Sequence, residues 1–255
     1  MKKKDLYKNI YVMENIMSAF DEVCKNTKNK RKVRNYKQYK CIYISRIYNI
    51  LKNKTYEVGP YNVFTIYEPK ERRIVSQGLQ DKVINHLVSR QILIPALESS
   101  LINENVASRK NMGTSKGYEL VKKYRRKCDI NYKSYYILKC DISKFFASID
   151  QDILKEKIKR KIKDKDALNI IFKIIDSEKN GLGIRFNDKP NFSNILFKWF
   201  RSFYKRKFKN KILCKISRWF FAISSVKRLF KIFIRRNKKI FIKRKINIKC
   251  KNKNI

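Results

Sequence analysis

The chain has 255 residues and carries 64 Lys and Arg against 21 Asp and Glu, a formal net charge of +43 that attracts polyanions in a strongly salt-dependent way. The six cysteines show no metal-ligand spacing and His86 is the only histidine, which argues against a zinc site and against histidine-based catalysis. No signal peptide and no apolar run long enough to span a bilayer is visible, so we expect a cytoplasmic protein of one or two domains with no membrane partner.

The first predicted region, residues 1–54, is helical. Apolar side chains recur at helical spacing over Leu6–Phe20 and again over Tyr43–Leu51, so these faces are interpreted as core. A strand-rich segment is predicted over 55–74, and a helix over 81–97.

Two adjacent arginines, Arg72 and Arg73, follow Pro69 within the strand-rich segment. On a strand or hairpin, two guanidinium groups that face one cleft can bind phosphate through paired hydrogen bonds. The alternative is a solvated run of charge in a chain that is basic throughout.

A glycine-containing turn is predicted before the next helix, at 115–127. Arg109 and Lys110 precede this turn, and Gly113 and Thr114 lie where the helix begins. Backbone N–H groups and cations in such a turn can hold a triphosphate or a template phosphate. The alternative is an ordinary helix N-terminus.

The segment Tyr135–Asp150 predicts a short buried strand with an aspartate, Asp141, at its end. Phe146 follows five positions later. Nucleic-acid polymerases present a metal ligand beside a side chain that reads the sugar in this way. The alternatives are that Asp141 caps a turn and that Phe146, like Phe145, belongs to the core. Residues 152–176 are predicted to be mostly helical.

The three segments 72–86, 108–117 and 135–150 resemble, in their order and spacing, those of bacterial reverse transcriptases of the retron, group II intron and diversity-generating branches. The resemblance covers roughly residues 56–184. It implies an α+β fold of the right-hand polymerase type, in which residues 55–188 form the fingers and part of the palm. The implied activity is that of an RNA-directed DNA polymerase.

The resemblance also implies roles for individual residues. Asp141 would be the catalytic carboxylate and would bind Mg²⁺ together with the carbonyl of Ile142. Phe146 would close against the 2′ position of the incoming sugar. The implied partners are an RNA template with a DNA primer, or an RNA/DNA hybrid, and deoxynucleoside triphosphates. The remaining nucleotide- or template-binding residues would be Arg72, Arg73, Arg109, Lys110, Gly113 and Thr114.

The sequence changes character at Lys189. From there to the end it holds 23 Lys and Arg residues and no Asp or Glu, whereas folded domains normally mix charges of both signs. After Gly181–Ile184 the family continues with Gly-Asn-Gln-Thr-Ser-Gln and then a Tyr-x-Asp-Asp hairpin, and neither is present. We therefore treat 189–255 as a separate basic tail that we expect to be poorly ordered.

We interpret this change as the result of a frameshift between Gly183 and Lys189. With A/T-rich codons and the bases regrouped one position downstream, Lys189–Ile195 becomes Asn-Gln-Thr-Ser-Gln-Ile-Phe, and Ile212–Trp219 becomes Tyr-Tyr-Val-Arg-Tyr-x-Asp-Gly. Val226–Phe241 becomes an amphipathic helix that contains acidic residues. The three matches occur in family order, although the hairpin ends in glycine rather than a second aspartate.

We therefore expect a reverse transcriptase relative that is catalytically incomplete. The other candidate carboxylates, Asp150, Asp152, Asp176 and Asp188, belong to helices or to the wrong end of the predicted strand. The alternative function is that of a non-catalytic, basic nucleic-acid-binding protein. In that case the tail would be a genuine arm that binds RNA or an anionic membrane surface.

Overall fold

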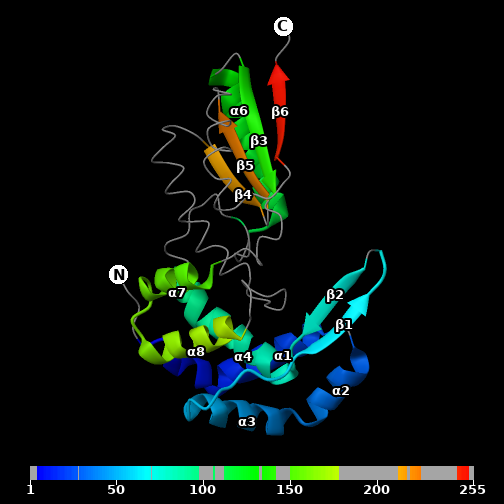
Figure 1. Cartoon of the computed structure of the whole chain (residues 1–255), viewed down its shortest axis with the longest axis vertical. Coiled ribbons are helices and arrows are strands. Elements are labelled where there is room, and N and C mark those ends of the chain that lie inside the picture. The colour runs from blue at the N-terminus through cyan, green and yellow to red at the C-terminus, as the bar shows by residue number, and fades with distance from the viewer. Residues whose placement is uncertain are drawn as a thin grey trace. The chain divides into compact units, whose positions relative to one another are not determined.

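The structure is a computed structural model (Figure 1). It describes residues 5–97 except 28 and 70, then 106, 112–131, 134–141, 150–177, 212–216, 219–224 and 246–252. For 66, 72–75 and every strand from 134 onward it describes the backbone alone. The chain forms two compact units, Met1–Ser99 with Ile149–Asn191 and Ser100–Ser148 with Phe192–Ile255, here called the first and second units. The described chain is mostly helical.

The first unit begins with helices, as the apolar spacing in residues 1–54 predicts. Helix α1 packs against α3 and α4 and buries Ile16 and Phe20, which lie one helical turn apart. Ile47 of α3 and Ile84 of α4 are also fully buried, so the three helices share one core. The N-terminal elements are η1 (Tyr7–Tyr11), α1 (Met13–Asn26), α2 (Lys30–Gln38) and α3 (Lys40–Lys52).

The predicted helix at 81–97 is observed as three consecutive pieces, α4 (Leu79–Leu87), the π-helical segment η2 (Val88–Leu93) and α5 (Ile94–Leu97). The wider π-helical turn comes just before Pro95, which has no N–H to donate to the carbonyl four residues earlier. Two further helices, α7 (Gln151–Lys159) and α8 (Lys165–Asp176), pack against each other in the same unit.

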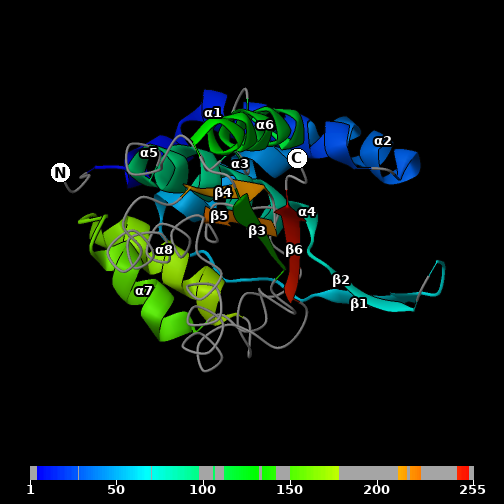
Figure 2. The ribbon, with the colours of Figure 1, turned by 90° about the horizontal axis from the view of Figure 1, so that it is seen from above.

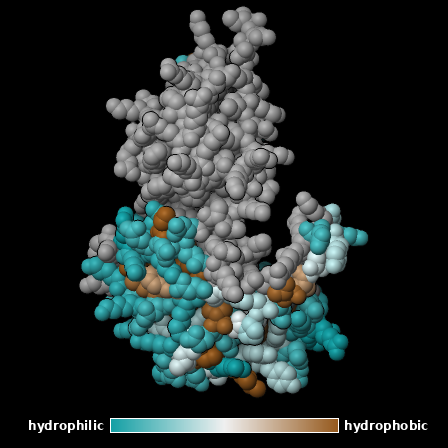
Figure 3. All heavy atoms as spheres, viewed as in Figure 1, coloured by the Kyte–Doolittle hydropathy of each residue, from teal (hydrophilic) through white to brown (hydrophobic). Residues whose placement is uncertain are grey.

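Strands β1 (Asn62–Ile66) and β2 (Arg72–Ser76) form an antiparallel hairpin, as the prediction of a strand-rich segment requires. Figures 1 and 2 show this hairpin extending away from the helices of the first unit. Val63 and Phe64 of β1 are about half exposed, at 47% and 48%. The space-filling view shows apolar surface at the hairpin (Figure 3).

Among its described residues, the second unit has one helix and a four-stranded sheet of order β4-β5-β3-β6, in which all neighbours are antiparallel. Helix α6 packs against the sheet at β4. We expected 189–255 to be poorly ordered, whereas the structure describes three of these strands within it. The elements are α6 (Thr114–Asn131), β3 (Ser134–Asp141), β4 (Ile212–Ile216), β5 (Trp219–Ser224) and β6 (Ile246–Asn252).

None of the helices in the described part of the chain has the length and apolar character needed to cross a bilayer.

Candidate functional site

Asp141 is the last residue of β3, a strand that lies between β5 and β6 in the sheet. Its position at the end of a central strand agrees with the sequence prediction. The pairing with β6 ends one residue earlier, at Cys140, while the pairing with β5 continues to Asp141. The side chain of Asp141 is outside the described residues, so its catalytic and metal-binding roles stay predictions.

The closed end of a hairpin lies beside Asp141. Strands β4 and β5 pair with each other up to Ile216 and Trp219, which leaves two residues, 217 and 218, between them. Trp219 is also the partner of Asp141 in the register of β3 and β5. The hairpin runs from Ile212 to Ser224, and its first part is the segment Ile212–Trp219, for which the frameshift hypothesis predicts a Tyr-x-Asp sequence in another frame. In that frame the aspartate corresponds to position 218.

The sheet offers no second carboxylate for a metal centre, because β4, β5 and β6 contain neither Asp nor Glu. Two of the other candidate carboxylates, Asp150 and Asp176, have partners of their own in the first unit. Asp150 caps α7 by accepting the Asp152 N–H and the Ile153 N–H, both at 3.0 Å. Asp176 forms an ion pair with Lys155. Among the described side chains, no three His, Cys, Asp or Glu groups converge as metal ligands would.

Gly113 and Thr114 lie at the beginning of α6, as predicted. Gly113 has a φ of +149°, a conformation that residues with a side chain rarely adopt, and its carbonyl accepts the Gly117 N–H at 3.0 Å. Thr114 is exposed as the first residue of the helix. Gly113 and Thr114 therefore lead into the helix where the sequence predicted, while the binding of phosphate by the turn stays a prediction.

The other predicted binding residues are described only in part. Arg72 and Arg73 lie on β2, opposite Ile66 and Thr65 of β1, and their side chains are outside the described residues. These two arginines belong to the first unit, whereas Asp141 belongs to the second. The predicted cleft that they share stays a prediction. The following predicted residues lie wholly outside the described part: Arg109, Lys110, Ile142 and Phe146.

The sequence prediction missed a buried carboxylate, Asp81, that connects α4 to the chain entering the hairpin. Its Oδ1 accepts the Tyr56 hydroxyl at 3.0 Å and the Gly59 N–H at 3.4 Å. Burial raises the pKa of Tyr56, and the Asp81 carboxylate raises it further. Gln77, Asp81, Asn85 and Ser89 are polar residues at four-residue spacing, a pattern typical of an exposed helix face, yet all four are buried, so the spacing alone does not reveal this site.

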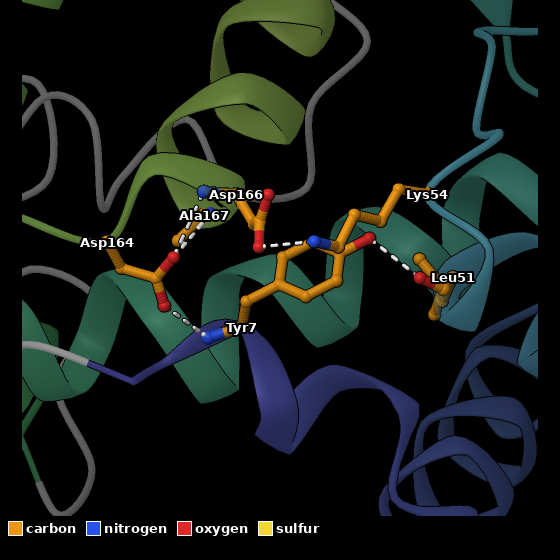
Figure 4. Close-up of polar contacts among 6 residues, drawn as sticks. All are labelled: Tyr7, Leu51, Lys54, Asp164, Asp166 and Ala167. Carbon is orange, nitrogen blue, oxygen red and sulfur yellow. Dashed lines mark hydrogen bonds and ion pairs between the residues drawn. The ribbon is translucent and has the colours of Figure 1, made fainter.

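A second polar cluster joins the N-terminal helices to α8 (Figure 4). Asp164 accepts the Tyr7 N–H at 2.8 Å and caps α8, while the Tyr7 hydroxyl donates to the Leu51 carbonyl at 2.8 Å. Burial, helped by nearby carboxylates, raises the pKa of Tyr7 to about 12. Lys54 and Asp166 add an ion pair at 2.7 Å. These contacts connect α8 to the N-terminal elements, and Tyr7, Lys54 and Asp166 also line a cleft of about 740 Å³.

The sequence matches no protein-family model and no curated protein. In fold it is similar to telomerase. Apo telomerase from Candida tropicalis, truncated from its C-terminal domain, has a TM-score of 0.58 at 15% identity over 79% of this chain and 53% of that chain. Telomerase from Candida albicans in complex with a TWJ fragment of telomeric RNA has a TM-score of 0.54 at 13% identity, over 80% of this chain and 44% of that chain.

The chain thus spans about half the length of the telomerase chains that it matches. At these identities the likeness is one of fold alone. The chain therefore has a fold similar to part of telomerase, while its relation to bacterial reverse transcriptases stays a prediction.

Proposed function

We propose that the chain derives from an RNA-directed DNA polymerase of the bacterial reverse transcriptase family and, as written, binds nucleic acid without extending a primer. Residues 55–188 would form the fingers and part of the palm. Asp141 would be the remaining catalytic carboxylate. RNA template with DNA primer, or an RNA/DNA hybrid, would be the ligand, and deoxynucleoside triphosphates would be substrates of the intact ancestor.

The pairing of the Asp141 strand with the β4–β5 hairpin is the observation that carries this proposal. The family resemblance calls for a carboxylate-bearing hairpin after the segment that contains the first aspartate, and a hairpin is found beside Asp141. Its sequence is the one that contains Tyr-x-Asp in the shifted frame. The likeness in fold to telomerase, a reverse-transcriptase-related polymerase, supports the same assignment.

The residues present do not fit a two-metal centre. Such a centre needs several carboxylates that converge on the ions. The four described strands of the sheet carry Asp141 and no other Asp or Glu, while Trp219 lies opposite Asp141. Asp141 and the Ile142 carbonyl would be the surviving Mg²⁺ ligands of the ancestor. With these residues alone, we expect the 255-residue chain not to catalyse primer extension.

Primer extension on an RNA template, with Mg²⁺ and deoxynucleotides, tests the proposal. The unchanged chain and a frame-repaired chain are compared, each with and without Asp141→Asn. We expect the unchanged chain to bind an RNA/DNA hybrid and produce no extension, and the repaired chain to extend the primer only when Asp141 is intact. Asp141-dependent extension by the unchanged chain would refute catalytic incompleteness. A repaired chain that neither binds nor extends would refute the polymerase ancestry.

A further inference from the structure

Helix α2 (Lys30–Gln38) buries none of its residues and carries five exposed cations. No acid that the structure describes forms an ion pair with any of the five. The sequence around them is also free of negative charge, because no Asp or Glu occurs from Val23 to Tyr56. The five cations, called the α2 cations below, are Lys30, Arg31, Lys32, Arg34 and Lys37.

The helix is held in place by contacts that leave these cations free. The Asn29 side chain caps α2 by accepting the Lys32 N–H at 3.0 Å. Val33 and Tyr36 are half-buried and lie three residues apart, on the inner side of the helix. The Tyr36 ring meets the Tyr43 ring of α3 edge to face, with ring centroids 5.8 Å apart. The backbone is thus fixed while the cations face solvent.

The surrounding groups do not neutralise this charge. The nearest acids along the chain, Asp21 and Glu22, already form ion pairs with Lys40 at 2.7 Å and with Arg90 at 2.5 Å. Lys82 of α4 adds positive charge rather than negative: burial lowers the pKa of this lysine, and the positive charge of Lys32 lowers it further. Residues four apart on a helix are neighbours, so the cations also repel one another within α2. A bound polyanion would relieve this repulsion.

We propose that the α2 cations bind the sugar-phosphate backbone of nucleic acid without reading its sequence. This inference rests on the function proposed above and assigns part of the binding to a surface outside the predicted polymerase segments. Nine helical residues rise about 13 Å. Over that length one strand of a duplex presents about four phosphates, a number close to that of the cations. Contacts made through phosphate alone carry no sequence information.

An anionic membrane is a poorer partner for this surface. A helix that lies on a bilayer inserts an apolar face among the lipids. In α2 the apolar side chain Val33 and the aromatic ring of Tyr36 are directed toward the rest of the unit. The other residues of the helix are polar or charged. The surface is therefore suited to phosphates that approach from water.

The test is a salt titration of binding by the full 255-residue chain. In one variant the α2 cations are replaced by glutamine, which is also a good helix former. The matched control replaces five cations that each face a carboxylate and so has the same net charge. Both are titrated with an RNA/DNA hybrid, and circular dichroism checks that the helix content is unchanged. The control positions are Lys40, Lys54, Arg90, Lys155 and Arg160.

We expect the magnitude of the slope of log affinity against log salt to fall by about 3.6 in the α2 variant, since about four phosphate contacts would each contribute about 0.9. In the control variant the magnitude of this slope should fall by less than about 1. A third variant, in which the three lysines of α2 become arginine, should retain the slope because it retains the charge. Loss of slope in this third variant would mean that charge is not the cause and would overturn the proposal.

Two further outcomes separate the inference from the proposed function. Equal slopes for the α2 variant and the control, with binding by the unchanged chain intact, would overturn the role of α2 alone. Failure of the unchanged chain to bind the hybrid would overturn both. Vesicles of phosphatidylcholine with phosphatidylserine serve as the competing partner. If the α2 variant loses vesicle binding but keeps hybrid binding, the surface belongs to a membrane and the proposal is wrong.

Discussion

Replacing Gly59 by alanine should destabilise the first unit, and this cost should vanish when Asp81 is also replaced. A Cβ at Gly59 would lie 2.9 Å from Oδ2 of Asp81. The carboxylate cannot move freely, because it is buried and accepts hydrogen bonds from the Tyr56 hydroxyl and the Gly59 N–H. Hydrogen bonds to charged groups contribute about 1.5–3 kcal/mol each. Weakening them should cost about 2 kcal/mol of unfolding free energy.

Asp81→Ala alone removes the same hydrogen bonds and leaves the buried Tyr56 hydroxyl without its acceptor. The expected cost is about 2–3 kcal/mol. In the double variant the new Cβ of residue 59 no longer meets a carboxylate. Gly59→Ala should then be neutral, or stabilise by about 0.5 kcal/mol because alanine restricts the unfolded chain. The expected coupling between the two positions is therefore about 2 kcal/mol, well above that of independent sites.

Urea unfolding of the full chain, followed by helical circular dichroism, measures the four free energies of this cycle. Gly78→Ala is the matched control, since its Cβ would lie 3.9 Å from the same Oδ2, an ordinary contact. Its effect should be equal with and without Asp81. If the changes in unfolding free energy caused by Gly59→Ala and Asp81→Ala add within about 0.5 kcal/mol in the double variant, the proposed clash between residue 59 and Asp81 is refuted.

Two other predictions concern the backbone at Gly113 and the buried hydroxyl of Tyr7. Gly113→Ala should cost about 1 kcal/mol more than Gly78→Ala, because both residues precede a helix but Gly113 alone of the two has a positive φ; equal costs in urea unfolding would contradict this. The pKa of Tyr7 is raised from 10.0 to about 12 in the folded chain, so its contribution to stability is fully present below pH 10 and is lost as the pH rises toward 12. Stability measured against pH should fall less steeply in this window for Tyr7→Phe, and an unchanged slope would count against the buried hydroxyl.

The sequence predicted those helices, strands and turns that are determined by residues close to them along the chain. The apolar spacing over Leu6–Phe20 gives η1 and α1, and the strand expected near Tyr135 is found as β3, ending at Asp141. Gly113 marks the turn before α6, because glycine readily adopts a positive φ. In each case the determining residues lie within a few positions of the element, so a single sequence carries the information.

Features that depend on distant partners were not predicted. Asp81 looks like an ordinary acid in the first turn of a helix, and its burial depends on Tyr56, which lies 25 residues away. The strands β4, β5 and β6 were missed because the absence of acids suggested an unfolded tail. Ile, Phe and Trp favour pleated structure whatever the origin of the sequence, and a strand partner such as β3 can pair with them.

The pairing of β3 on both sides affects how the tail can be studied. Ending the chain before residue 189 would remove β5 and β6 and leave the backbone of Ser134–Asp141 unpaired along both edges. An uncovered strand that contains the run Tyr-Tyr-Ile-Leu is a template for intermolecular association. Such a truncation would tend to aggregate and would report poorly on the electrostatics of the tail. Replacing tail lysines by uncharged residues, so that β5 and β6 stay in place, is therefore the better way to measure what the charge of the tail contributes.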